Sequence, residues 1–399
     1  MLSVTTVAGA FGYPAETRIA SRRVGGRGKT MASGLIKPRE IALDIGGSSL
    51  VALEVTGSAD RLKLRGCWEW PLSEGLVVDG EIVDADLFAR ELRAFASQNK
   101  LRNRSVQVSV SNQKVIVRNV EMPDMTEDEL RGAIEFQAQD YIPIPVEEAV
   151  IDFHTVGKRT NAEGVSRQEV LLVAAQRSMI STLHTSIRQA GLRVAGIDVS
   201  SMALVRALIP PTPFLAAGAD GGVCRGIVDI GSSVSTLVIA VDNVVKFTRV
   251  INFSSDRFAR VLGEQRSIPA SDAHTLAQRI GLIGPMPADS TLYASEVIDN
   301  TRQRLGEVAS ELSEEIRRSL HYYQGQEQAV PLTELILSGR GALVRNLDFH
   351  LAEALNMPVT VGNPLLMIAE NASDHADVDL ALMAPYLAIA VGLVLPEEE

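Results

Sequence analysis

The sequence predicts an α/β protein made of two similar lobes, because one strand–turn–strand motif occurs twice. The first copy reads IALDIGGSSLVALEV over 41–55, and the second reads GIVDIGSSVSTLVIAV over 226–241. In each copy an apolar strand ends at an aspartate, a turn rich in glycine and serine follows, and a second apolar strand begins. A single such motif is most often an ordinary β-turn. Two copies at a domain-scale spacing instead indicate two lobes that face each other.

Length and composition agree with two lobes. The 399 residues exceed the usual size of one domain, while 46% apolar and 22% charged residues are ordinary for a globular protein. The chain has two cysteines, Cys67 and Cys224, so a disulfide framework is excluded and a reducing cytoplasm is expected. The formal net charge of −11 argues against nucleic acids and anionic membranes as main partners.

Residues 1–38 are predicted to be a disordered basic tail, since they hold six lysines and arginines against Glu16 alone. The segment does not resemble a signal peptide, and Met31 is an alternative start. No stretch reaches the ~18 apolar residues that cross a bilayer. We therefore expect a chain without a transmembrane segment of its own.

The first lobe is expected over 39–210, with a loop rich in Pro, Gly and Ala over 210–222 as its boundary. A helix begins at Thr126, which forms a capping box with Glu129, and it stops at the prolines that follow Tyr141. Alternating apolar residues predict strands, and apolar residues at helical spacing predict helices. Strands are expected at 62–70, 106–110, 114–120, 149–156, 168–175 and 193–197, and helices at 87–99, 126–141, 178–190 and 198–208.

The second lobe is expected over 211–399, with a smaller insertion at about 255–315. After the Asp229 hairpin, strands are expected at 245–252, 334–338 and 359–361, and helices at 254–262, 270–281, 293–323, 347–355 and 381–395. The last helix is apolar, and its length predicts a packed core helix instead of a membrane span.

The two hairpins carry the chemistry that the sequence predicts. Glycine lets the backbone come close to a bound group, and successive N–H groups with serine hydroxyls can surround a phosphate. Asp44 and Asp229 each end a strand where a carboxylate could hold Mg²⁺ through water. The predicted phosphate-binding residues are Gly46, Gly47, Ser48 and Ser49 in the first hairpin and Gly231, Ser232 and Ser233 in the second. The six histidines are scattered and show no metal-ligand spacing.

This set of motifs resembles the actin–sugar kinase–Hsp70 ATPase fold. The two aspartate hairpins look like its two phosphate motifs, and LSGRGA over 337–342 looks like its adenosine motif. The helix end over 314–320 is similar to the helix that frames the nucleoside in that fold. The resemblance implies ATP and Mg²⁺ between the lobes. It implies that the residues framing the nucleoside are Glu314, Arg317, Gly339, Arg340 and Gly341.

A closer resemblance is to the PilM family of type IV pilus assembly, which is similar to the cell-division protein FtsA. It is carried by the block over 117–152, which includes MTEDEL, EFQAQDYIPIP and EEAVID, and by GEIVD over 80–84 and GNP over 362–364. The resemblance implies a subdomain inserted into the first lobe at about 114–178. It also implies a protein that is cytoplasmic and peripheral to the inner membrane, where it meets other pilus assembly proteins.

The same resemblance implies the partner. In that family the cytoplasmic tail of the inner-membrane protein PilN binds a groove of the first lobe beside the inserted subdomain. The residues expected to line this groove are Met122, Tyr141, Ile142, Pro143, Ile144 and Pro145.

Three positions depart from the family pattern. Val51 stands where the family often has lysine, Arg340 replaces the second glycine of the adenosine motif, and Ser200 replaces a glutamate. A serine cannot serve as a carboxylate base, so at most weak ATPase activity is expected. Two alternatives remain open: a related cytoplasmic component of a type II secretion system, and a small-molecule kinase of the same fold.

Overall fold

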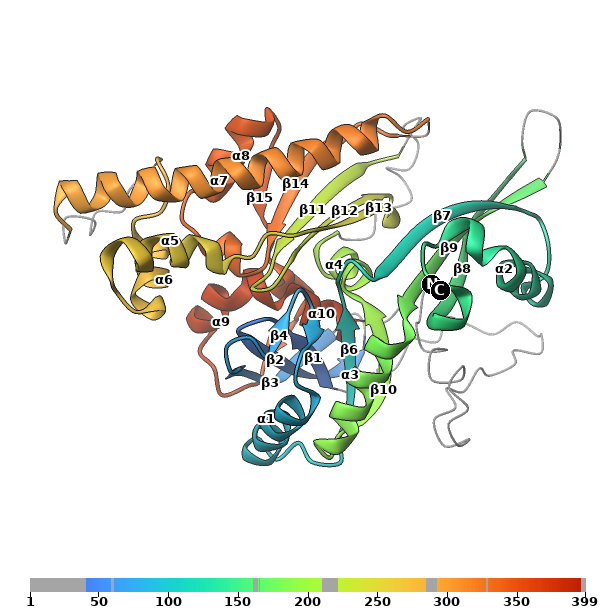
Figure 1. Cartoon of the computed structure of the whole chain (residues 1–399), viewed down its shortest axis with the longest axis horizontal. Coiled ribbons are helices and arrows are strands. Elements are labelled where there is room, and N and C mark those ends of the chain that lie inside the picture. The colour runs from blue at the N-terminus through green and yellow to red at the C-terminus, as the bar shows by residue number, and fades with distance from the viewer. Residues whose placement is uncertain are drawn as a thin grey trace.

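The computed structural model describes residues 41–58, 61–160, 164, 166–209, 222–284, 293–327 and 329–395. The predicted basic tail 1–38 and residues 210–221 of the predicted boundary loop lie outside the described residues. Figure 1 shows the lobe with the first aspartate hairpin below the lobe with the second, and a smaller unit to their right.

The first lobe is built on a six-stranded sheet in the order β10-β6-β1-β2-β3-β16. Its strands are β1 (Ile41–Ile45), β2 (Ser49–Ser58), β3 (Arg61–Pro71), β6 (Ser105–Val110), β10 (Arg193–Val199) and β16 (Glu370–Asn371). β1 pairs antiparallel with β2 and parallel with β6, so both of its edges are filled. Its residues Ile41, Ala42 and Leu43 are buried, as expected for a central strand.

Helices α1 (Ala85–Gln98), α3 (Arg177–Gln189) and α4 (Ser200–Leu208) complete this lobe. Asp84 begins α1, because its carboxylate accepts a hydrogen bond from the Leu87 N–H at 2.8 Å. α1 and α3 pack against each other, and α4 packs against β10 and β6. Residues 75–83 contain a small hairpin of β4 (Val77–Val78) and β5 (Glu81–Ile82), whose turn contains Gly80 at φ 75°.

The C-terminal segment returns to the first lobe. β16 pairs with β3, and α9 (Asp377–Met383), η7 (Ala384–Leu387) and α10 (Ala388–Val394) follow. α10 packs against α4, β1 and β2, and its apolar residues join the first core. The second lobe expected over 211–399 is therefore shorter in the structure, because these buried residues belong to the first sheet. The single helix expected over 381–395 is interrupted by the 3₁₀ turn that contains Pro385.

Within the described residues, one stretch would be long and apolar enough to cross a membrane. It is Asp377–Val394, with a mean hydropathy of 1.7, and half of it is buried inside the structure. The core helices of globular proteins have the same composition, and the packing of α10 gives this stretch that role.

The second lobe has a five-stranded sheet in the order β13-β12-β11-β14-β15. Its strands are β11 (Cys224–Ile230), β12 (Ser235–Val241), β13 (Val244–Ile251), β14 (Glu334–Ser338) and β15 (Val359–Val361). Its helices are α5 (Asp256–Arg266), α6 (Ala270–Arg279), α7 (Ser295–Gln324) and α8 (Leu347–Leu355), with the short turn η5 (Arg340–Leu343) after β14. The turn η6 (Pro364–Met367) follows β15 and packs against α4 and α10 of the first lobe. The long helix α7 contributes ten buried residues, among them Leu305, Leu312 and Tyr323, and crosses the whole lobe (Figure 1).

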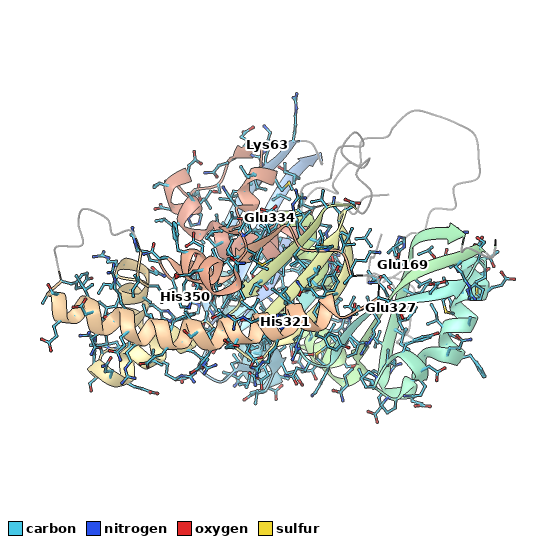
Figure 2. The ribbon with its side chains drawn as sticks, turned by 90° about the horizontal axis from the view of Figure 1, so that it is seen from above. Lys63, Glu169, His321, Glu327, Glu334 and His350 are labelled. Carbon is cyan, nitrogen blue, oxygen red and sulfur yellow. The ribbon has the colours of Figure 1, made fainter. Side chains whose placement is uncertain are left out.

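A third, smaller unit has its own sheet and its own core. β7 (Val115–Pro123), β9 (Ser166–Gln176) and β8 (Ala149–Thr160) pair in that order, with α2 (Glu127–Tyr141) and η3 (Val146–Glu148) between β7 and β8. This inserted unit lies within the range 114–178 to which the sequence assigns a subdomain. Both bonds of the predicted capping box are present at the start of α2. In Figure 2, Glu169 points from this unit toward the second lobe, and its carboxylate lies 2.6 Å from Lys246 Nζ.

Met122 and Ile142 are each 2% exposed and lie in the core of the inserted unit, together with Leu130 and Ile134. Both had been predicted to line the partner groove. Because their side chains hold α2 against the small sheet, they are not free to contact a partner in this structure.

Candidate functional site

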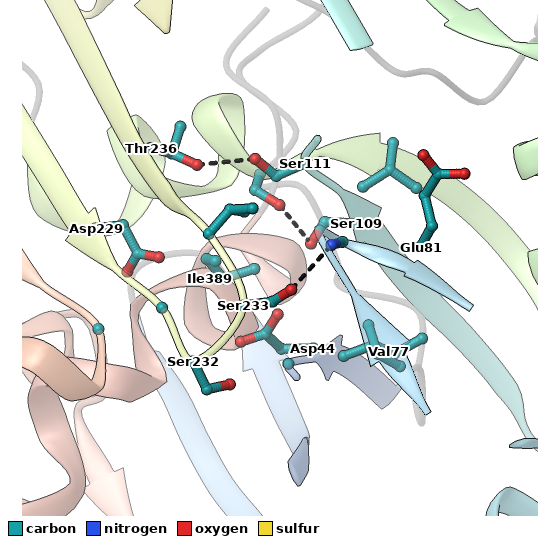
Figure 3. A pocket seen from close by; sticks show the side chains of 18 of the residues that line it. Asp44, Val77, Glu81, Ser109, Ser111, Asp229, Ser232, Ser233, Thr236 and Ile389 are labelled. Carbon is teal, nitrogen blue, oxygen red and sulfur yellow. Dashed lines mark hydrogen bonds between the residues drawn. The ribbon is translucent and has the colours of Figure 1, made fainter. Parts of the chain in front are cut away.

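The two aspartate hairpins face each other across the boundary between the lobes and enclose a cavity of about 190 Å³ (Figure 3). Most of the predicted nucleotide-binding residues meet there. The predicted residues that line the cavity are Asp44, Gly46, Ser49, Asp229, Gly231, Ser232, Ser233, Gly339 and Arg340. Gly47 and Ser48 complete the first turn beside it.

Each hairpin turn is closed by one backbone hydrogen bond. Gly46 N–H donates to Ser49 O at 2.9 Å, and Gly231 N–H donates to Val234 O at 3.1 Å. A Cβ atom at Gly46 would lie 2.8 Å from Ser232 Oγ, and one at Gly231 would lie 2.7 Å from Val234 O. The turns therefore need glycine because other atoms come too close for a side chain.

The two turns interlock in this structure. Ser232 Oγ accepts hydrogen bonds from Gly47 N–H at 2.8 Å and Ser48 N–H at 3.2 Å. Ser233 Oγ accepts one from Gly80 N–H at 3.0 Å (Figure 3). The backbone amides expected to hold phosphate thus already point at an oxygen atom, which is supplied by the opposite lobe. Such an arrangement fits a phosphate oxygen in the same place once Ser232 moves away.

The two carboxylates repel each other in a buried site. Burial and then the charge of Asp229 raise the pKa of Asp44 to about 7, although Arg340 acts in the opposite direction. Burial also raises the pKa of Asp229 to about 6, against a hydrogen bond from Ser338 that lowers it. Two such carboxylates, flanked by serine hydroxyls, form a donor set that suits a hard divalent cation.

The described part of the chain contains no group of three or more His, Cys, Asp or Glu side chains placed to hold a metal directly. The histidines, for example, are dispersed: His321 lies on α7 and His350 lies on α8 (Figure 2). Two carboxylates without a third ligand fit an ion that keeps most of its waters, as Mg²⁺ does.

The predicted adenosine motif forms a tight turn after β14. Gly339 has φ 78°, and a Cβ atom there would lie 2.6 Å from Ile230 O. A Cβ atom at Gly341 would lie 2.3 Å from Ile230 Cγ2. Arg340 lies between these glycines and extends into the first lobe, where Nη2 donates to Ser49 Oγ at 2.7 Å and pairs with Glu69. Its guanidinium also lies over the Tyr386 ring, with Cζ 4.3 Å from the ring centroid.

Glu314 and Arg317 do not line the cavity. They pair with each other on α7, and Arg317 also donates to Ala354 O at 2.7 Å, which joins α7 to α8. In this structure they have a packing role within the second lobe.

Several residues that line the cavity were not predicted from the sequence. The polar ones are the hydroxyls of Ser109, Ser111, Ser178, Thr182 and Thr236, together with Glu81, and most of the others are apolar. Ser111 and Thr236 form a further hydrogen bond between the lobes at 2.8 Å, and Ser200 Oγ donates to Ser109 Oγ at 3.0 Å (Figure 3). Isolated serines carry little sequence signal. The GEIVD motif that contains Glu81 was noted only for its resemblance to the PilM family.

A duplicated aspartate hairpin at an interlobe cavity, on two sheets of this topology, defines a protein of the actin-like ATPase fold. A family model described as "Type IV pilus assembly protein PilM" matches residues 42–398. The chain belongs to this family, which confirms the resemblance found in its motifs.

Two solved structures illustrate the fold. One is described as "PilM-PilN type IV pilus biogenesis complex", with 24% identity, a TM-score of 0.73, and coverage of 90% of this chain and 98% of that chain. The other is the ethanolamine utilization protein EutJ from Carboxydothermus hydrogenoformans, with 13% identity, a TM-score of 0.50, and coverage of 90% and 92%. At these identities both comparisons show a shared fold.

Proposed function

We propose that this protein is a nucleotide-binding scaffold of type IV pilus assembly, which acts on the cytoplasmic side of the inner membrane. The observation that carries the nucleotide site is the cavity between the Asp44 and Asp229 hairpins. The two carboxylates would hold a hydrated Mg²⁺, and the amides of the two glycine-serine turns would hold phosphates. Mg²⁺ would supply positive charge that offsets the phosphates.

Nucleotide acts mainly as a structural ligand in this proposal. Ser200 offers a hydroxyl bonded to Ser109, and the third carboxylate of the cavity, Glu81, is paired with Lys114 at 2.8 Å. Neither is a free base that could take a proton from water. A bound nucleotide would still stabilise the two-lobed state by mass action.

Titration calorimetry tests the nucleotide site. We expect the protein to bind ATP and ADP with Mg²⁺, and to bind them more weakly when EDTA removes the metal. We expect turnover far below the ~10 s⁻¹ that is typical of enzymes. Folded protein that gives no heat with either nucleotide would contradict the proposal, and turnover at the typical enzyme rate would contradict the structural role.

The inserted unit is proposed to bind the cytoplasmic tail of a PilN-like inner-membrane protein, because the solved PilM structure named above is a complex with PilN. Met122 and Ile142 are buried, so the contact falls to exposed side chains of the unit. Phe136 on α2 is 89% exposed, which is unusual for a large aromatic residue. Pro143 is exposed beyond the end of α2, and Tyr141 and Ile144 are partly exposed.

Phe136→Ser is expected to weaken binding of the PilN tail peptide by about tenfold or more, since an exposed aromatic anchor commonly dominates an interface. The matched control is Phe349→Ser, which removes a 57% exposed phenylalanine from α8 of the second lobe. Fluorescence anisotropy with a labelled peptide measures both variants. Equal affinities for Phe136→Ser and the wild type would place the partner elsewhere.

A further inference from the structure

Arg340 connects the turn that follows β14 with the first lobe. Its neighbours Gly339 and Gly341 are fixed against Ile230, so the backbone holds this residue at one point. Its side chain then reaches Ser49, in the first aspartate hairpin, and Glu69 on β3. The guanidinium is therefore placed beside the turn whose amides suit phosphate.

Arg340 is also the one basic side chain among the described residues that line the cavity, which has three carboxylates, Asp44, Glu81 and Asp229. A nucleoside triphosphate would bring several more negative charges into this space. A nearby guanidinium is the protein group best suited to offset them, because its planar fork matches two phosphate oxygens.

The geometry favours a phosphate over an adenine ring as the ligand of Arg340. One face of the guanidinium already lies on Tyr386, with 4.3 Å between Cζ and the ring centroid. Both polar contacts, to Ser49 and to Glu69, use Nη2. Within the described residues, the Nη1 and Nε donors make no hydrogen bond and are available to an anion.

The contact with Glu69 is replaceable. The side chains of Arg340 and Glu69 are 25% and 36% exposed, so solvent and salt weaken their attraction. Glu69 would keep a partner after losing Arg340, because Tyr386 Oη donates to its second oxygen at 3.2 Å.

We propose that Arg340 binds the nucleotide's phosphates and that Glu69 competes with them for its guanidinium. Phosphate binding then exchanges a contact between the lobes for a contact to the ligand. This inference rests on the proposed nucleotide site. It adds Arg340 as a ligand of the phosphates and Glu69 as an acidic group that competes with them.

The test compares ATP with adenosine in calorimetry at fixed ionic strength with Mg²⁺. Arg340→Gln is expected to weaken ATP binding by about tenfold or more, since hydrogen bonds to charged groups are strong, and to leave adenosine binding unchanged. Glu69→Gln is expected to strengthen ATP binding by up to about fivefold, the range of a partly exposed ion pair. In the double variant that gain should disappear, because it depends on Arg340.

Thermal unfolding confirms that each variant is folded, and Arg340→Lys, which keeps the charge without the fork, should fall between the wild type and Arg340→Gln. Equal losses of ATP and adenosine affinity in Arg340→Gln would show a contact to the base and overturn the inference. Unchanged ATP affinity in Arg340→Gln, or weaker ATP binding in Glu69→Gln, would overturn it as well. A wild-type protein that binds no ATP would instead contradict the proposed function itself.

Discussion

Asp44→Asn is expected to weaken Mg²⁺-dependent ATP binding on the order of 10- to 100-fold, as for other groups that hold a metal through water. The same variant is expected to stabilise the ligand-free protein above pH 7. The pKa of Asp44 is about 7 in the folded protein against a usual value of 3.8, so the folded state holds this proton more tightly. The free energy that the protonated Asp44 contributes to folding is fully present below about pH 4 and is lost as the pH rises to about 7.

The measurement is the midpoint of thermal unfolding at pH 4.5, 6 and 8 without nucleotide. As the pH rises, we expect the unfolding midpoint of the wild type to fall relative to that of Asp44→Asn. At pH 8 it should be lower by about 2 to 4 °C. Asp374→Asn is the control, because Asp374 is an exposed aspartate away from the cavity. If the wild type and Asp44→Asn respond identically to pH, then Asp44 does not face a buried, like-charged partner.

The sequence alone was enough to predict features that depend on residues close together in the chain. Both aspartate hairpins were found because glycine and serine at fixed positions after an apolar strand are a local pattern, whereas the GRG turn was identified by its resemblance to an adenosine motif. Thr126 likewise predicted the start of α2, since a capping box spans only four residues. These features are set by near neighbours in the chain, which a sequence displays directly.

Features that depend on distant packing were not predictable in the same way. Ile142 follows the end of α2 beside two prolines, and only the fold of the small sheet shows that its side chain is buried. Arg340 was expected beside the nucleoside, whereas its contacts with Ser49 and Glu69 come from the opposite lobe. Outside the two hairpins, the cavity serines Ser109, Ser111, Ser178 and Ser200 belong to four different elements or loops, and no local pattern unites them.

The assignment of the C-terminal segment is the clearest case, because it required knowing which sheet the last helix packs against. Gly392 on α10 lies against Ala203 on α4, and a Cβ atom at Gly392 would be only 1.9 Å from Ala203 O. The carbonyl of Gly392 also accepts a hydrogen bond from Arg206 Nε at 2.9 Å. The helices can approach this closely only because Gly392 has no side chain.

Gly392→Ala is therefore expected to destabilise the protein by about 3 kcal/mol or more, since the added methyl overpacks a closed interface. Gly306→Ala is the matched control, because Gly306 is also inside a helix but has no neighbouring atom within 4 Å of a Cβ position. There the change should be neutral or stabilising by up to about 1 kcal/mol, from helix propensity alone. Urea unfolding of both variants measures the difference. A Gly392→Ala protein as stable as the wild type would show that α10 does not pack on α4, and that the C-terminal segment lies outside the first lobe.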